Sequence, residues 1–109
     1  MSYKIEVTAF FEKQLKRLVK KYPSIKKDFT ALVTTLYENP KQGTSIGNNC
    51  YKIRIAIESK GKGKRGGARI ITHIHVIRNT IYLLSIYDKA EQGTIADKDL
   101  EYWLQDLNK

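Results

Sequence analysis

At 109 residues the chain has room for one compact domain and none to spare for a second. Its single cysteine, Cys50, excludes an internal disulfide, and no group of cysteines and histidines has the spacing of a structural zinc site. The 20 Lys and Arg residues outnumber the 11 Asp and Glu residues, and this net charge of +9 favours an anionic partner without identifying it.

The sequence also predicts a cytoplasmic protein that makes no membrane contact. No apolar run reaches membrane-spanning length, and the N-terminus lacks the apolar segment of a signal peptide. The positive charge is unevenly distributed, since residues 1–87 carry 17 basic and 5 acidic side chains, whereas residues 88–109 carry 3 and 6. The cationic surface therefore belongs to the body of the domain rather than to its C-terminal segment.

The first forty residues predict a strand followed by two helices. Alternation from Tyr3 to Val7 is typical of a short strand, and Thr8 can cap the helix that follows. Two apolar stripes at helical spacing come next, consisting of Phe11, Leu15, Leu18, Val19 and Tyr22, and then of Ile25, Phe29, Leu32, Val33 and Leu36. Because Pro23 and Pro40 end these stripes, we expect an antiparallel helical hairpin that packs on one face of a sheet.

Three later segments are rich in branched and aromatic residues and predict consecutive antiparallel strands. They run from Tyr51 to Ile57, from Ala68 to Ile77 and from Ile81 to Tyr87. A terminal amphipathic helix should begin at Thr94 or Asp97, with Leu100, Trp103, Leu104 and Leu107 on its apolar side. The expected fold is one α+β domain over residues 1–109 with the order β-α-α-β-β-β-α.

The segment from Lys52 to Arg69 holds seven basic side chains and only one acidic residue, Glu58. The period of two in a strand places Lys52 and Arg54 on one face, and the apolar side chains on the opposite face should pack against the helices. In the last strand Ile81, Leu83, Ser85, Tyr87 and Lys89 share one parity. If this set lies on the same face as Lys52, then Lys52, Arg54, Arg69, Tyr87 and Lys89 converge; otherwise the face is simply solvated.

Three blocks of the sequence resemble the RelE/HigB-type toxins of the RelE/ParE superfamily. They are Tyr51-Lys52-Ile53-Arg54, the stretch from Lys60 to Ile71 that contains Gly66-Gly67-Ala68-Arg69, and the stretch from Ile81 to Gln92 that contains Tyr87-Asp88-Lys89-Ala90-Glu91. The resemblance implies a bacterial toxin that cuts messenger RNA in the ribosomal decoding site without a metal or other cofactor. It also implies a cognate antitoxin that silences the toxin.

The resemblance also assigns roles to the five convergent residues. Cleavage by attack of a ribose 2′-hydroxyl needs a positioned nucleophile, neutralised phosphate charge and a protonated leaving oxygen. Arg69 would clamp the phosphate because its planar guanidinium binds two oxygens. Lys52 and Arg54 would stabilise charge at the nucleophile and along the backbone, and Lys89 would lie near the leaving group. Tyr87 would stack on a base or act as an acid or base.

The glycine-rich turn between two of the predicted strands should contact RNA through mobile cations. Lys60, Lys62, Lys64 and Arg65 are its basic residues, and ribosomal RNA is their expected partner, although a solvated turn would have the same composition. The turn lacks the Gly-x-x-x-x-Gly-Lys-Ser/Thr spacing of a nucleotide-binding loop. Nucleotide hydrolysis is therefore disfavoured.

His73 and His75 share one face of a strand with Arg69, and a histidine pair can perform acid–base chemistry near neutral pH. Their position in the middle of a strand favours a packing or sheet-surface role instead, and two histidines alone make a poor metal site. Cys50 is expected to be a small packing residue.

Two other functions remain open at this point: a ParE-like gyrase poison that cuts nothing, and a non-catalytic RNA-binding module. The antitoxin should present an acidic helix or extended segment to the cationic surface. The terminal helix with Trp103 would be either its docking point or a lid formed by the chain itself.

Overall fold

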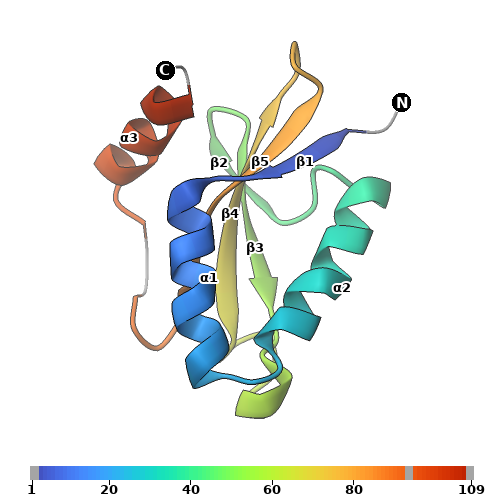
Figure 1. The fold of residues 1–109 in the computed structure, drawn as a ribbon. Coiled ribbons are helices and arrows are strands. Elements are labelled where there is room, and N and C mark those ends of the chain that lie inside the picture. Colours follow the sequence, from blue (N-terminus) through green and yellow to red (C-terminus); the bar gives the residue numbers. More distant parts are fainter. Residues whose placement is uncertain (1–2, 93–94, 108–109) are drawn as a thin grey trace.

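The computed structural model describes residues 3–92 and 95–107 of the chain (Figure 1). Its helices are α1 (Ala9–Lys21), α2 (Ile25–Glu38) and α3 (Asp97–Leu107), and its strands are β1 (Lys4–Val7), β2 (Thr44–Gly47), β3 (Cys50–Ile55), β4 (Ala68–His75) and β5 (Thr80–Asp88). A short 3₁₀ turn spans Glu58–Lys60. The terminal helix thus begins at the second of its two predicted starts, and Thr94 lies outside the described residues.

The fold is α+β, as predicted, but its sheet is mixed rather than wholly antiparallel. The strand order is β1-β5-β4-β3-β2, and β1 runs parallel to β5, with Lys4 opposite Thr80. The helical hairpin carries the chain from the β1 edge to the far edge, and four antiparallel strands then lead back to β1 (Figure 1). The sequence pattern missed β2 because its four residues include only one large apolar side chain.

Two apolar clusters lie on opposite faces of the sheet. The hairpin of α1 and α2 packs on the first face, which includes the alternating residues Ile53, Ile55 and Ile57 as predicted. Helix α3 packs on the second face through Leu100 and partly buried neighbours such as Trp103. None of the helices within the described ranges is long and apolar enough to span a membrane.

Strand β5 contains a β-bulge that corrects the predicted parity of its side chains. Ser85 lies opposite Ile71, but the next residue of β4, Thr72, lies opposite Leu83, so Leu84 is an extra residue in β5. Before the bulge Leu83 faces the helical hairpin and Leu84 faces α3, and after it Ile86 faces the hairpin. Tyr87 therefore shares the α3 face with Leu84, which a strict period of two does not allow.

Candidate active site

Three of the five predicted catalytic residues form a row across β3, β4 and β5, near one end of these strands. Arg54 of β3 is the partner of Arg69 in β4, and Arg69 is the partner of Tyr87 in β5. Because paired residues in neighbouring strands share a face, all three side chains start from the face that α3 also occupies. We call this row the arginine end of the α3-facing surface.

The Arg69 side chain is buried and held in place, with only 4% of the residue's surface accessible. Its guanidinium donates hydrogen bonds to the carbonyl oxygens of Lys64 at 2.9 Å, Ala68 at 3.1 Å and Arg65 at 3.2 Å. Burial and the neighbouring charge of Arg54 lower the pKa of Arg69, although a guanidinium stays charged under these conditions. The side chain thus fastens the basic loop to the start of β4.

Tyr87 is 3% exposed, and its buried hydroxyl has no hydrogen-bond partner among the residues that the structure describes. Burial raises the pKa of this phenol, and the nearby Arg69 offsets the rise only in part. Tyr87 is therefore a neutral hydrogen-bond donor at physiological pH. Its ring packs in the cluster that contains Leu100 of α3, so it is not available for stacking in this conformation.

Lys52 and Lys89 flank the row. Lys52 lies opposite Ile71, two residues from Arg54 and on the same face, and lines a cavity of about 140 Å³ with Asp97 and Leu100 of α3. Lys89 is exposed just past the end of β5, where its backbone N–H donates to Gly67 O at 3.0 Å. The structure therefore brings Lys52 beside the row and places Lys89 at its rim.

The basic loop divides into one largely covered, paired lysine and three exposed cations. Lys62, Lys64 and Arg65 are exposed, and their contact with RNA stays a prediction. Lys60 is different, since its side chain is 11% exposed and its Nζ lies 2.6 Å from Asp88 Oδ1. Its predicted position as a mobile cation is wrong, because a fully buried carboxylate requires a partner of opposite charge.

Asp88 is the residue of this region that sequence reasoning missed. Its buried carboxylate accepts hydrogen bonds from Lys60 Nζ, from Tyr22 Oη at 2.5 Å and from the backbone N–H of Ala90 at 3.0 Å. Burial alone would raise the pKa of Asp88, but these donors outweigh it and hold the pKa at about 2. An acidic residue at the end of an otherwise apolar strand was the available signal. Asp88 joins α1, the basic loop and the end of β5.

Gly67 allows β4 to begin close against β3. A Cβ atom at this position would lie 2.0 Å from the carbonyl oxygen of Ile55, a distance that no side chain tolerates. The glycine before the Ala68-Arg69 pair is therefore required by the close approach of two backbones. It helps to set the position from which the Arg69 side chain starts.

Cys50, His73 and His75 lie at the other end of the same face, which we call the histidine end. Cys50 Sγ is 3.4 Å from His73 Nδ1, and burial raises the pKa of the thiol to about 12. Burial also lowers the pKa of His73, and His75 Nδ1 accepts the backbone N–H of Arg78 at 3.2 Å. The buried, protonated cysteine agrees with the packing role expected for Cys50. His73 and His75 are half-buried, and each has a polar neighbour, Cys50 Sγ for His73 and the backbone of Arg78 for His75.

Neither histidine belongs to a recognisable metal centre. Within residues 3–92 and 95–107, no three His, Cys, Asp or Glu side chains are grouped so that they could hold an ion. The two imidazoles instead line a hollow of about 340 Å³ with Leu104 and Leu107 of α3.

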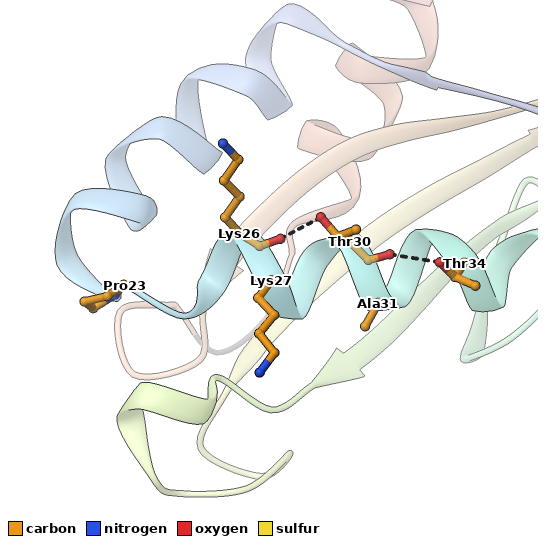
Figure 2. Close-up of a pocket in the computed structure, with 6 residues that line it drawn as sticks. All are labelled: Pro23, Lys26, Lys27, Thr30, Ala31 and Thr34. Atoms are coloured by element: carbon orange, nitrogen blue, oxygen red, sulfur yellow. Dashed lines mark hydrogen bonds between the residues drawn. The ribbon is translucent and has the colours of Figure 1, made fainter.

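A larger hollow of about 570 Å³ lies along α2 (Figure 2). Its two hydroxyl groups are used within the helix, because Thr30 donates to Lys26 O at 2.9 Å and Thr34 donates to Thr30 O at 3.3 Å. Figure 2 shows that Lys26 and Lys27 point to different sides of α2 rather than toward a common ligand. This hollow is a shallow surface feature without convergent chemistry.

No protein-family model matches the chain. Among solved structures, a double arginine mutant of the E. coli toxin RelE in the free state aligns with a TM-score of 0.62 and 13% identity, over 98% of this chain and 99% of that chain. The chain has the RelE fold. This finding confirms the predicted RelE-like architecture, which extends over nearly the whole sequence.

Two toxin–antitoxin complexes contain chains with the same RelE fold. The intact E. coli RelBE complex aligns with a TM-score of 0.61 and 13% identity, over 80% of this chain and 96% of that chain. The RelBE2 complex of Mycobacterium tuberculosis aligns with a TM-score of 0.56 and 15% identity, over 81% and 99%. At such identities the agreement concerns the course of the backbone, so the side chains must carry any functional conclusion.

Proposed function

We propose that the chain is the toxin of a toxin–antitoxin system and acts as a ribosome-dependent endoribonuclease in the bacterial cytoplasm. The observation that carries the proposal is the row of Arg54, Arg69 and Tyr87 on a RelE fold. Lys52 lies beside this row, and the exposed basic loop is bound to it through Arg69. Cations fixed on a sheet can stabilise phosphate charge, and exposed lysines can bind the RNA backbone. A module that only binds RNA needs the exposed lysines of the loop, but it does not need cations fixed on the sheet.

Arg69 acts as the phosphate clamp in this proposal. Its guanidinium already binds the carbonyl oxygens of Lys64 and Arg65, so a phosphate reaches it by replacing those two acceptors. Hydrogen bonds between a guanidinium and a phosphate are stronger than those to neutral carbonyls, which favours the exchange. The loop is released as the phosphate binds, and Lys62, Lys64 and Arg65 become free to follow the RNA backbone.

Tyr87 is the proton donor in the proposed reaction, and the lysines stabilise charge. The 2′-hydroxyl gives its proton to solvent water as its oxygen bonds to the adjacent phosphorus, and the bond from phosphorus to the 5′-oxygen breaks. The 5′-oxygen takes a proton, and a 2′,3′-cyclic phosphate is left on the other fragment. A neutral phenol beside Arg69 can supply this proton, and its hydroxyl has no partner within the described residues to give up first. Lys52 and Arg54 stabilise the nucleophile and the phosphorane, and Lys89 supports the leaving group.

RNA reaches Tyr87 only after α3 has moved away from it. Leu100 packs in the same cluster as Tyr87, and the first turn of α3 lines the cavity beside Lys52. The proposal therefore requires a bound state in which this part of α3 is displaced from the sheet. Of the described α3 residues, Leu100 is buried and Trp103, Leu104 and Leu107 are only partly buried, and this incomplete burial favours such a change.

The proposed partner that silences the toxin is a cognate antitoxin. The solved complexes with the same fold contain toxin and antitoxin together. An inhibitor of this chain must cover a surface dominated by Lys52, Arg54 and the basic loop, so an acidic helix or extended segment fits it best. Ribosomes and messenger RNA are the other partners that the proposal requires.

Translation in vitro of a defined message tests the proposal. We expect the purified protein to cut the message at discrete positions only when ribosomes are translating it. Binding of the message without cuts would favour an RNA-binding module. DNA damage that depends on gyrase, measured with supercoiled plasmid in a parallel reaction, would instead favour a ParE-like poison.

A further inference from the structure

Gln14 is a polar residue within the apolar stripe of α1. It lies three positions after Phe11 and four before Leu18, and both of these are fully buried. Its Oε1 atom accepts two hydrogen bonds from β5, one from Ser85 Oγ at 3.0 Å and one from the backbone N–H of Ile86 at 3.0 Å. These contacts place the Gln14 amide at the two residues that directly follow the extra residue of the bulge, Leu84.

The bulge needs these contacts because β5 loses its neighbouring strand at this point. The pairing of β1 with β5 ends at Val7 and Leu83, where the chain turns into α1. The hydroxyl of Thr8 donates to Leu83 O at 3.1 Å, and Gln14 accepts from Ser85 and Ile86 a few residues further along. Polar side chains of α1 thus replace the missing strand, since the edge groups of β5 would otherwise be buried without partners.

The bulge decides which side chain of β5 faces Arg69. With the extra residue in place, Ile86 packs against the helical hairpin and Tyr87 lies opposite Arg69 on the α3 face. Without that residue the parity of the strand end would invert, and Tyr87 would point into the hairpin core. The face of the sheet on which Tyr87 lies therefore depends on the bulge, which Gln14 contacts from α1, the helix on the opposite face.

We propose that Gln14 is the positioning residue for Tyr87, because its amide oxygen closes the β-bulge that turns Tyr87 toward Arg69. This inference rests on the proposed function only where it concerns cutting. The geometry of the bulge stands independently of it. Gln14 itself does not touch the RNA.

Two substitutions distinguish the role of the Gln14 hydrogen-bond acceptor from that of the space its side chain fills. Gln14→Leu removes the acceptor and leaves the Ile86 N–H unpaired, whereas Gln14→Glu keeps a side-chain oxygen that accepts both bonds. Gln105→Leu, on the exposed side of α3, is the matched control. We expect hydrogen exchange of the Ile86 amide to be about tenfold faster in Gln14→Leu, and unchanged in Gln14→Glu and Gln105→Leu.

Cutting of a ribosome-bound message should follow the same order. In Gln14→Leu we expect kcat to fall about tenfold with little change in KM, since Tyr87 loses its position while the cations that bind RNA remain. Gln14→Glu should restore kcat. The titration midpoint of Tyr87, followed by NMR of labelled tyrosine, should move toward its ordinary value in Gln14→Leu only.

Two results would overturn the inference. Unchanged exchange of the Ile86 amide in Gln14→Leu would show that Gln14 does not hold the bulge, whatever the cutting assay gives. Faster exchange together with an unchanged kcat would show that Gln14 supports the strand but does not position Tyr87. A wild-type protein that leaves every message intact would remove the proposed function, while the exchange experiment would still decide the role of Gln14 at the bulge.

Discussion

The arginine end and the histidine end occupy the same face of the same three strands, yet they differ in charge. The first holds two charged arginines, whereas burial favours the neutral forms of Cys50 and His73 at the second. At the arginine end Arg54 and Arg69 carry permanent charges beside a neutral Tyr87, whose hydroxyl is unpaired within the described residues. At the histidine end burial keeps the thiol of Cys50 protonated and lowers the pKa of His73.

This difference supports the proposed active site at the arginine end, and it means that residue type alone is a poor guide to the site. Histidine and cysteine are the more familiar catalytic residues, but at the histidine end they pack against each other and line a hollow with α3. The arginine end combines fixed charge, an available proton and an adjacent cationic loop. These features support the proposal that the arginine end, rather than the histidine end, cleaves a phosphodiester.

Substitution of the central arginine should give the largest effect. In Arg69→Ala we expect the single-turnover rate of message cutting to fall about 100-fold or more, because the phosphate clamp is lost. Arg69→Lys should recover only part of that rate, since an ammonium lacks the planar fork. The melting temperature of each variant, measured by circular dichroism, checks that the domain remains folded.

The matched control for Arg69 is Arg78→Ala at the histidine end. Arg78 is exposed and donates to Tyr82 Oη at 3.1 Å, so it is an arginine of the same face without a place in the row. We expect its cutting rate to stay within about threefold of wild type. Equal losses in both variants would remove the distinction between the two ends.

Loss of the buried carboxylate beside the arginine end should cost stability. The pKa of Asp88 is about 2 in the folded protein and near 4 when unfolded, so its contribution is complete above pH 4 and is lost as the pH falls toward 2. This shift corresponds to about 2 kcal/mol. Asp88→Asn should therefore lower the free energy of unfolding at pH 7, measured in urea, and flatten its dependence on pH below 4.

Glu101→Gln, an exposed carboxylate of α3, is the control for that experiment. Its free energy of unfolding should stay within about 0.5 kcal/mol of wild type. A similar loss in both variants would mean that the general charge of the chain, rather than the contacts of Asp88, sets the stability in acid.

The cations of the basic loop should differ in a smaller but measurable way. Lys62→Ala combined with Lys64→Ala should weaken RNA binding several-fold and lower the slope of log affinity against log salt by about 0.7 for each phosphate that is no longer neutralised. The melting temperature should not change. Lys60→Ala should instead lower the melting temperature, since it leaves Asp88 without its closest cation.

The smallest effect on cutting is expected at the histidine end. His73→Ala combined with His75→Ala should leave the cutting rate within about twofold of wild type at pH 7. Because the folded pKa of His73 lies below its ordinary value, the wild-type stability should begin to fall as the pH drops below about 6.5. Unfolding in urea at pH 7 and pH 5.5 should show this loss in the wild type and a weaker one in the variant.

Regular alternation made part of the site predictable from the sequence. Strand β3 keeps its period of two without interruption, so Lys52 and Arg54 could be placed on one face and Ile53 on the other. The helical hairpin was equally clear, because its apolar stripes end at prolines. Each of these features depends on residues close together in the chain.

Features that depend on distant residues were not predictable. The ion pair of Lys60 depends on Asp88, and the strand end that carries Tyr87 is bound by Gln14, which is more than seventy positions away in the sequence. The parallel pairing of β1 likewise depends on where the helical hairpin returns the chain. The residue pattern of one segment does not reveal which distant residue or strand it will contact, so these three features could not be predicted from it.

The most direct test of the proposed chemistry uses two ribosome-bound messages that differ by a single oxygen atom. One carries ribose throughout, and the other carries one 2′-deoxynucleotide at the position that is cut. If the arginine end promotes attack by the 2′-hydroxyl, the first message is cut and the second stays intact at that position. Equal cutting of both messages, or of neither, would contradict the account.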